Sequence, residues 1–504
     1  MMIASKKIPI SVKSLKTIAV LYLAIPFFLF FGTWLELVFS VPLCLILLYC
    51  TIQFRRKLTD TATFSVPLFQ VILSLIVAFL WVGISGNGCM GLQWNDLIKP
   101  LAISKDIVTQ NGPILYRDPI SKEYFLLCQY MSFYLTVPTL LGFLPWNGLL
   151  FAMFLYTYSG VVLGLVWFWH LSGTYSPIVT LFFIFFCGID FIGFAYSAGL
   201  KNAFLSLKND FFAFQPFWGN TMIDAKMPFM YQSNTHSLFW GPQHAIATWM
   251  GTGMFLYDFL NKKDLESSPF YLALLIFLSP FIVLGILPFL LFAAIQKGIL
   301  KFFSIENLLM IPIVAMIVWY LSSLPLGTIN SGFIFYKSES FVGYLLQIKA
   351  FLIFWVADVG VWIIPVLIFF FRTKNKEMKN LALLTALTLT FVPFYRFGVF
   401  NDWAQRVSMP ALFITAILVV KVFMNSKIWL RLYLIFIFCL GAWDPIYFVS
   451  NSLKLTGGRI KFMPKPYDET PTYYKACEMS NYPIYQNMAP ISASFYQIAC
   501  KKNQ

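Results

Sequence analysis

Apolar residues in this chain occur in long unbroken runs, and short polar or charged turns separate the runs. The runs are about 17 to 27 residues long, and about 20 residues of α-helix span the roughly 30 Å hydrocarbon core of a bilayer. A transmembrane β-strand would instead alternate apolar and polar residues over about ten positions, and runs such as 71–82 and 182–187 do not alternate. The pattern therefore predicts an all-α polytopic membrane protein.

The hydropathy of these runs predicts about 13 transmembrane helices. They are expected near 17–31, 33–54, 65–85, 148–170, 175–198, 236–260, 269–283, 284–299, 306–324, 345–371, 380–396, 406–424 and 429–449. Hairpin turns are therefore expected at 31–33 and 283–284. The segment 124–143 is aromatic but interrupted by polar residues. We expect one or two juxtamembrane helices there, lying on the outer surface of the membrane.

Charged residues make up only 11% of the chain, against roughly a quarter in soluble domains. Basic clusters occupy nearly every second turn, the uncharged 171–174 connection being the exception. These clusters are Arg55, Arg56 and Lys57, Lys262 and Lys263, Lys297 and Lys301, the stretch 372–379, and Lys427 and Arg431. Because such clusters stay in the cytoplasm, the N-terminus is predicted inside, and an odd number of spans places the C-terminus outside. The net charge of +15 is then a topology signal, so we expect membrane lipid and no nucleic acid as a partner.

This topology divides the chain into a transmembrane domain, 1–449, and a small extracytoplasmic tail, 450–504. Two large loops, about 86–147 and 199–235, are expected on the outer face beside the tail. The tail holds Cys477 and Cys500, which are candidates for a disulfide if that side is oxidising. The sequence contains no CxxC, GxxxxGK[ST], GxSxG or HExxH motif, so it offers no ATP-binding loop and no hydrolase or metal signature.

The first large loop contains one carboxylate in a position suited to chemistry. Asp96 follows the third predicted span, after the glycine-rich stretch 86–91, and Trp94 lies two residues before it. Partial burial beside an aromatic ring would raise the pKa of this carboxyl, and a carboxylate held there is able to act as a general base. The alternative is that Asp96 only caps a helix over 97–109.

A second group of polar residues, His236, Gln243 and His244, begins the sixth predicted span. The two histidines are about two helical turns apart, which would place them on one face of a continuous helix. Imidazole and carboxamide groups at headgroup depth suit a phosphate or pyrophosphate. The alternative is that these residues anchor the span at the interface. No third ligand is spaced for zinc.

The turn before the twelfth predicted span contains Arg396, Asp402 and Arg406. Arginine is expensive near lipid, and two arginines at span ends suit an anionic headgroup. The alternative is that they extend toward water or pair with Asp402. Lys99 and Arg117 are further cations predicted on the same side of the membrane.

Several of these segments resemble parts of the GT-C superfamily of membrane glycosyltransferases. The run Trp94-Asn95-Asp96-Leu97-Ile98-Lys99, then Ala102-Ile103-Ser104-Lys105-Asp106 and the stretch 124–142, resembles the first outer loop of bacterial members. The segments 240–244 and 401–411 are similar to segments of uncharacterised members. The resemblance covers most of the chain as architecture, through short motifs.

The resemblance implies a transferase that moves a sugar from a polyprenyl-phosphate carrier to a glycan, lipid or protein outside a bacterial inner membrane. Asp96 would be the catalytic base of an inverting reaction. Arg396, Arg406 and His244 would neutralise the departing lipid phosphate, with Lys99, Arg117, His236, Gln243 and Asp402 completing the binding set. Since fixed cations can stabilise that leaving group, we expect neither a metal nor another cofactor.

Two other classes of function stay open on the sequence. The long outer loops and the lack of an evident repeat favour an enzyme over a transporter or lipid flippase. Asp358, a carboxylate inside a predicted span, keeps the transporter open, because such residues often mark transport pathways. A non-catalytic assembly protein would use the polar outer residues only to anchor its loops. A measurement of sugar transfer distinguishes the glycosyltransferase from both of these classes, since neither of them transfers a sugar.

Overall fold

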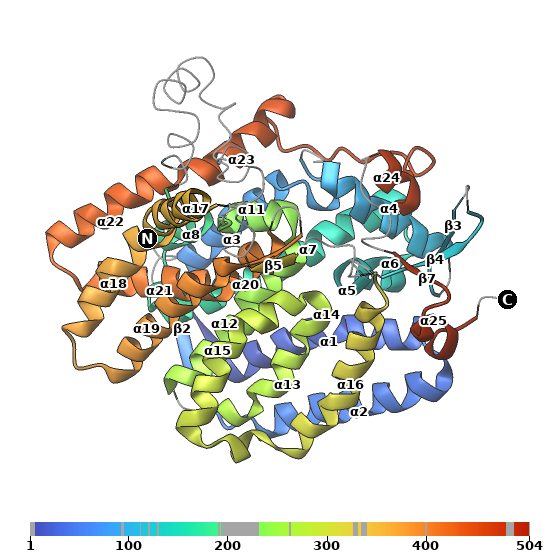
Figure 1. The fold of residues 1–504 in the computed structure, drawn as a ribbon, viewed down its shortest axis with the longest axis horizontal. Helices are drawn as coiled ribbons and strands as arrows, with labels where there is room; N and C mark the ends of the chain where they lie inside the picture. The colour runs from blue at the N-terminus through green and yellow to red at the C-terminus, as the bar shows by residue number, and fades with distance from the viewer. Residues whose placement is uncertain are drawn as a thin grey trace.

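The computed structural model of the chain is an assembly of packed helices, with three small sheets among the residues that it describes (Figure 1). It describes residues 6–91, 95–110, 112–118, 121–128, 131–189, 192, 231–261, 264–325, 331–333, 340–398, 401–479 and 488–502, with only the backbone described at 95–97 and 131. The prediction of an all-α bundle is therefore confirmed, whereas the small sheets were not predicted.

The first half of the chain begins with the N-terminal helix pair and continues as a bundle of helices. They are α1 (Val12–Trp34), α2 (Leu37–Lys57), α3 (Leu68–Ile84), η2 (Asn87–Cys89), α4 (Asn95–Thr109), α5 (Met131–Tyr134), α6 (Thr136–Leu141), α7 (Trp146–Ser172), α8 (Pro177–Phe185), α11 (Asn234–Trp240) and α12 (Pro242–Asn261). Helix α12 packs closely along α7, and α1 packs along α2. Buried side chains of these helices form one continuous core with the second half.

The second half continues the bundle and ends in short tail helices. It contains η3 (Leu265–Ser267), α13 (Ser268–Ala273), α14 (Leu275–Leu278), α15 (Pro280–Lys297), η4 (Ile299–Phe302), α16 (Ile305–Ser322), α17 (Phe341–Phe354), the π-helical turn η7 (Trp355–Gly360), α18 (Val361–Phe371), α19 (Lys376–Phe391), η8 (Val392–Phe394), α20 (Asp402–Val407), α21 (Met409–Asn425), α22 (Ile428–Gly441), α23 (Trp443–Leu455), α24 (Tyr473–Met479) and α25 (Ser494–Ala499).

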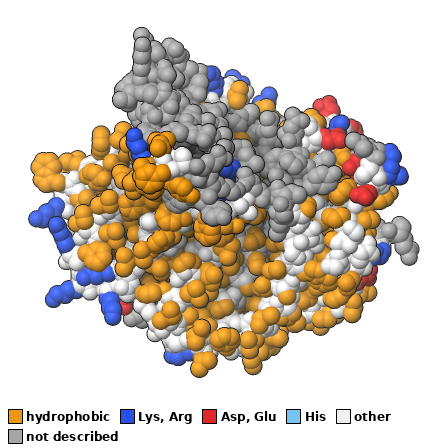
Figure 2. Space-filling model, in the orientation of Figure 1, with side chains coloured by type: hydrophobic (Ala, Val, Ile, Leu, Met, Phe, Trp, Pro, Cys, Tyr) orange, Lys and Arg blue, Asp and Glu red, His pale blue; other side chains and the backbone are white. Residues whose placement is uncertain are grey.

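Seven helical stretches within the described residues are long and apolar enough to cross a bilayer. They are Val12–Trp34, Leu37–Lys57, Trp146–Ser172, Pro280–Lys297, Ile305–Ser322, Phe341–Phe371 and Ile428–Leu455. Their outward side chains are apolar, as at Val38, which is 70% exposed, and apolar atoms cover most of the described face in Figure 2. A water-soluble protein does not present so large an apolar surface, so the chain is a helical membrane protein.

Helices occur at all thirteen predicted ranges, although several are shorter than a full span and α8 ends at Phe185. The number of crossings therefore stays a prediction.

Both predicted hairpin turns were misplaced. The first break falls at Leu35 and Glu36, because Leu35 pairs with Cys500 and the Glu36 amide donates to the Ala499 carbonyl (2.9 Å). The second falls at Ser279, where an extended backbone precedes Pro280.

The strands tie distant parts of the chain together. Antiparallel β1 (Lys7–Ser11) and β2 (Thr63–Pro67) form one sheet, and β5 (Ser331–Phe333) and β6 (Tyr395–Phe397) form another. The third sheet has the order β3 (Leu115–Arg117), β4 (Tyr124–Leu127) and β7 (Met488–Pro490). The segment predicted as juxtamembrane helix over 124–143 therefore begins as a strand and becomes helical only at α5 and α6.

The C-terminal tail packs against the first large loop. Helix α24 packs on α4, and β7 pairs with β4 so that Ala489 lies opposite Leu126. Cys477 and Cys500 are both buried and both free, so the predicted disulfide between them is wrong. Packing separates them, since Cys477 belongs to α24 whereas Cys500 pairs with Leu35 beside α1.

A buried charge cluster fixes the start of α1 to the end of α12. The Lys16 ammonium pairs with the carboxylates of Asp258 and of Asp264, the latter at 3.1 Å, and the Tyr271 hydroxyl donates to Asp258 (3.1 Å). Removing one partner of a buried ion pair leaves an uncompensated charge. This cluster therefore holds the N-terminal helix in register with the centre of the bundle.

Candidate functional site

Helix breaks position the polar side chains at one end of the bundle. The backbone at Ser279 is extended and Pro280 starts α15, so the chain leaves the helical conformation between α14 and α15. The Ser279 hydroxyl lies 2.7 Å from Nδ1 of His244, in the first turn of α12. This contact leaves Nε2 as the imidazole nitrogen able to reach a ligand.

Arg406 comes from the short helix α20, which Asn401 caps by accepting a hydrogen bond from the Ala404 amide (3.2 Å). Nη2 of Arg406 lies 2.9 Å from Oδ1 of Asp402, and the guanidinium lies over the Phe281 ring, 5.7 Å from its centre. The pairing with Asp402, which the sequence offered as the alternative to a headgroup role for Arg406, is therefore present. A guanidinium carries five N–H donors, so one such pair leaves donors for a ligand.

These residues meet at a cavity of about 360 Å³. Its lining consists of Cys128, Ser132, Gln243, His244, Ile276, Phe277, Leu278, Pro280, Phe281, Val318, Tyr320, Leu321, Ser322, Leu324, Phe397 and Arg406. We call it the Arg406 cavity. It joins three residues that the sequence nominated from two separate segments, namely Gln243, His244 and Arg406.

The walls of the Arg406 cavity are mostly apolar, and its polar groups converge from two sides. Oε1 of Gln243 is buried without a hydrogen-bond partner among the described residues, so it is available to a hydroxyl donor. Burial raises the pKa of the Cys128 thiol, which therefore stays neutral. Val318 is 48% exposed on α16, so the apolar wall reaches the lipid-facing surface of that helix.

The cavity lies at the end of the bundle away from the basic turns. Helix α15 begins at Pro280 in the cavity wall and finishes at Lys297. Helix α16 begins near Glu306, which pairs with Lys57 (2.7 Å), and its last residues return to the cavity. The cavity and the basic clusters are thus separated by the length of these two helices.

His236 does not face the cavity, contrary to the expectation that it shares a helix face with His244. The backbone leaves the helical conformation at Gly241, so α11 and α12 are separate helices. Nδ1 of His236 lies 3.9 Å from Oδ1 of Asp444, and its ring packs against Phe448 with centres 4.5 Å apart. His236 therefore belongs to the contact with α23.

Three predicted cations also lie outside the cavity lining. Arg396 is in β6 and its Nε donates to the Gly398 carbonyl (3.1 Å), although its neighbour Phe397 lines the cavity. Lys99 is buried within α4. Arg117 is exposed in β3 and its guanidinium lies over the Tyr124 ring (5.8 Å). Only one predicted arginine thus reaches the cavity.

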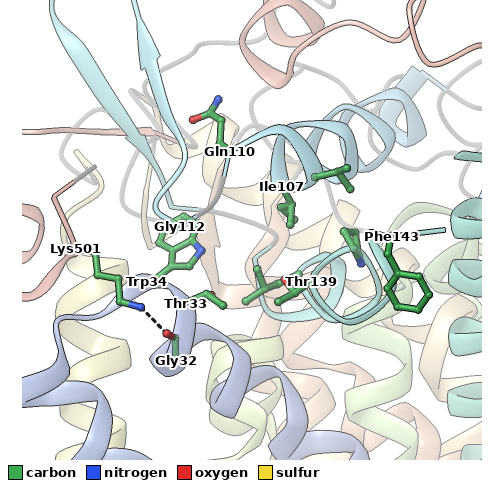
Figure 3. A pocket seen from close by; sticks show the side chains of 13 residues that line it. Gly32, Thr33, Trp34, Ile107, Gln110, Gly112, Thr139, Phe143 and Lys501 are labelled. Atoms are coloured by element: carbon green, nitrogen blue, oxygen red, sulfur yellow. Dashed lines mark hydrogen bonds between the residues drawn. The ribbon is translucent and has the colours of Figure 1, made fainter. Parts of the chain in front are cut away.

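The side chain of Asp96 lies outside the described residues, so its place relative to the cavity stays a prediction. The backbone of α4 begins at Asn95, which puts Asp96 in the first turn of the helix instead of before it. The far end of α4 reaches a second cavity, of about 550 Å³ (Figure 3).

This second cavity, the Lys501 cavity, is built from four parts of the chain. The end of α1, the end of α4, helix α6 and the C-terminus contribute, among others, Thr33, Gln110, Thr139 and Lys501. Nζ of Lys501 donates to the Gly32 carbonyl (2.7 Å). The Trp34 ring lines this cavity and meets the Tyr320 ring of the Arg406 cavity edge-on, with centres 6.0 Å apart. The two cavities therefore share an aromatic wall.

Sequence reasoning missed several residues of this region. The helix break at Ser279 could have been predicted from the sequence, because a serine followed by proline marks the start of a helix. Tyr320 and Lys501 carried no local signal, since their roles arise from packing of the tail on α1 and α16. The chain matches no protein-family model, no curated protein and no solved structure.

Proposed function

We propose that the protein is a glycosyltransferase that takes a sugar from a polyprenyl-phosphate carrier and passes it to an acceptor outside the cytoplasm. The observation that supports this proposal is the Arg406 cavity, where a guanidinium, an imidazole and a carboxamide meet apolar walls. A lipid phosphate combines the same two features, an anion and a hydrocarbon chain. The family resemblance of the first loop supports the same class of reaction.

The proposed topology has about 13 spans, with the N-terminus in the cytoplasm of a bacterium and the C-terminus outside its inner membrane. The basic turns then mark the cytoplasmic side. Because α15 and α16 each connect those turns to the cavity, the cavity would open at the outer face. Polyprenyl-linked donors would be encountered on that face.

The donor would bind with its phosphate at Arg406 and its first isoprene units along Phe277, Val318 and Leu321. Cavities for small ligands are usually about 300 to 1,000 Å³, so about 360 Å³ suits a headgroup and the start of the chain. The rest of the isoprenoid would leave past the exposed side of Val318 into the bilayer. Gln243 Oε1 would accept a hydrogen bond from a sugar hydroxyl.

The transfer would proceed by direct displacement with inversion. The acceptor hydroxyl oxygen bonds to the anomeric carbon while the bond from that carbon to the phosphate oxygen breaks. The acceptor proton passes to Asp96, and the phosphate keeps the electron pair. Arg406 and Nε2 of His244 stabilise the charge that develops on the phosphate, and such preorganised donors are usually the largest catalytic contribution.

Transfer from a radiolabelled polyprenyl-phosphate sugar tests this proposal. We expect Asp96→Asn to abolish transfer while donor binding is retained. The matched control is Asp468→Asn, which makes the same change at an exposed position of the tail and should transfer at the wild-type rate. Equal transfer by Asp96→Asn and wild type would refute the role of Asp96, and a folded wild type that transfers nothing would refute the enzyme.

One observation favours a transporter or flippase as the second candidate. Asp358 is 3% exposed within the π-helical turn η7, where it accepts a hydrogen bond from the Tyr231 amide (3.4 Å). Buried carboxylates and π-helical turns in membrane helices often occur at functional sites. Movement of the intact lipid-linked sugar across proteoliposomes, without transfer and with loss in Asp358→Asn, would select this candidate.

A further inference from the structure

A third cavity, of about 420 Å³, lies at the basic end of the bundle. It is formed where α7 and α18 end, α19 begins and α21 ends. Ser172, Thr174, Asn375 and Asn425 contribute polar groups, Phe370 contributes an apolar wall, and Lys421 supplies a cation. We call it the Lys421 cavity. It shares no residue with the Arg406 cavity and does not depend on the proposed function.

Lys421 has no ion-pair or side-chain hydrogen-bond partner within the part of the chain that the structure describes, although it is half-buried. It lies one helical turn before the end of α21 at Asn425. A cation withdrawn from water without a partner costs free energy, and an anion in the cavity would recover that cost. The unpaired ammonium therefore points to an anionic ligand.

The rim of the Lys421 cavity also favours an anionic ligand. Asn375 and Met378 line the cavity, and the same turn carries Arg372, Lys374, Lys376 and Lys379. Figure 2 shows basic side chains gathered along the edge where α18 turns into α19. The single acid of this turn, Glu377, already has an interaction of its own. The local potential thus attracts negative charge.

The surroundings indicate that the anion is attached to a lipid. Three apolar side chains near the cavity face outward, with Ile368 49%, Phe371 55% and Met424 48% exposed. An acyl chain can lie against them while its phosphate enters the cavity. Basic pockets between membrane helices on the cytoplasmic side commonly bind anionic headgroups.

We propose that the Lys421 cavity binds the phosphate of an anionic phospholipid from the leaflet at the basic end of the bundle. Lys421 pairs with the phosphate, and the hydroxyl and carboxamide groups of Thr174 and Asn375 donate hydrogen bonds to the headgroup. The site holds the ends of α7, α18 and α21 together with the start of α19.

Native mass spectrometry of the purified full-length protein with added phosphatidylglycerol, phosphatidylcholine or inorganic phosphate tests this proposal. We expect retained phosphatidylglycerol in wild type, and at least about a fivefold loss of its affinity in Lys421→Gln, since one cation near a headgroup contributes about that factor. Lys421→Arg keeps the charge and should retain the lipid. The matched control is Lys427→Gln, an exposed lysine outside the cavity, which should lose less than twofold.

Three results would overturn the proposal. They are equal retention of the two lipids, equal losses in the Gln variants of Lys421 and Lys427, and binding of inorganic phosphate without any binding of phosphatidylglycerol. The last would indicate a soluble anion as the ligand. If Lys421→Gln does not fold, the Lys421→Arg protein still allows the comparison of the two lipids. Sugar transfer is not measured, so failure here leaves the proposed enzyme untouched.

Discussion

Among the described residues, Arg406 contacts the Asp402 carboxylate and the Phe281 ring, and these two contacts leave part of its guanidinium free. The side chains of Arg406 and Asp402 are 27% and 30% exposed, and exposed ion pairs contribute at most about 1 kcal/mol to stability. Asp402 therefore orients the arginine more than the pair stabilises the fold. The guanidinium also lies over the Phe281 ring, so two contacts orient Arg406 at the cavity.

Replacing Arg406 should separate function from stability. We expect Arg406→Gln to lower the rate of transfer from a polyprenyl-phosphate sugar by roughly a hundredfold, as for loss of one charge-stabilising donor. Arg406→Lys should lose less, because the charge remains without the planar fork. Arg372→Gln, at the basic end, is the control and should keep the wild-type rate. Wild-type transfer by a folded Arg406→Gln protein would contradict the role given to this arginine.

At the scale of elements, the tail helix α24 is attached to α4 through one buried carboxyl. Oδ2 of Asp106 accepts hydrogen bonds from the Tyr116 hydroxyl and from the Tyr473 amide, the latter at 2.7 Å. Burial raises the pKa of Asp106 from 3.8 to about 6, although both hydrogen bonds and Lys105 act in the opposite direction. We therefore expect the stability of the junction between the first loop and the tail to depend on pH.

The sign of this dependence follows from proton binding. Between pH 4 and 6 the folded protein holds the Asp106 proton more tightly than the unfolded chain, so this group's contribution to stability falls as the pH rises. A rise of about two pKa units corresponds to on the order of 3 kcal/mol. We expect the difference in thermal midpoint between wild type and Asp106→Asn to change across this range in detergent. A difference that stays constant with pH would contradict the prediction.

At the scale of the whole molecule, the tail completes the walls of the predicted outer end. Phe495 of α25 packs on Tyr320 with ring centres 5.2 Å apart, and Lys501 closes the second cavity against the end of α1. Basic turns collect at the other end of α15 and α18. This separation of charge along the bundle is what orients a membrane protein.

Reporter fusions after Lys57 and after Gly458 test the orientation. The basic cluster that ends α2 should remain inside, so a reporter active only in the cytoplasm should signal after Lys57. An odd number of spans places Gly458 outside, where only a reporter active in the periplasm should signal. A cytoplasmic signal at Gly458 would make the count of about 13 spans wrong. It would also remove the outer placement of the tail.

The sequence by itself determined the helical membrane architecture and the positions of most helices, because hydrophobic length and charge are local properties of a segment. It also nominated Gln243, His244 and Arg406, whose residue types are costly at a membrane unless they have partners. Their meeting was decided only by tertiary structure, since it depends on the break at Ser279 and on packing across the bundle. The same long-range packing turned His236 toward Asp444 and brought Lys501 to α1, and no local pattern encodes such contacts.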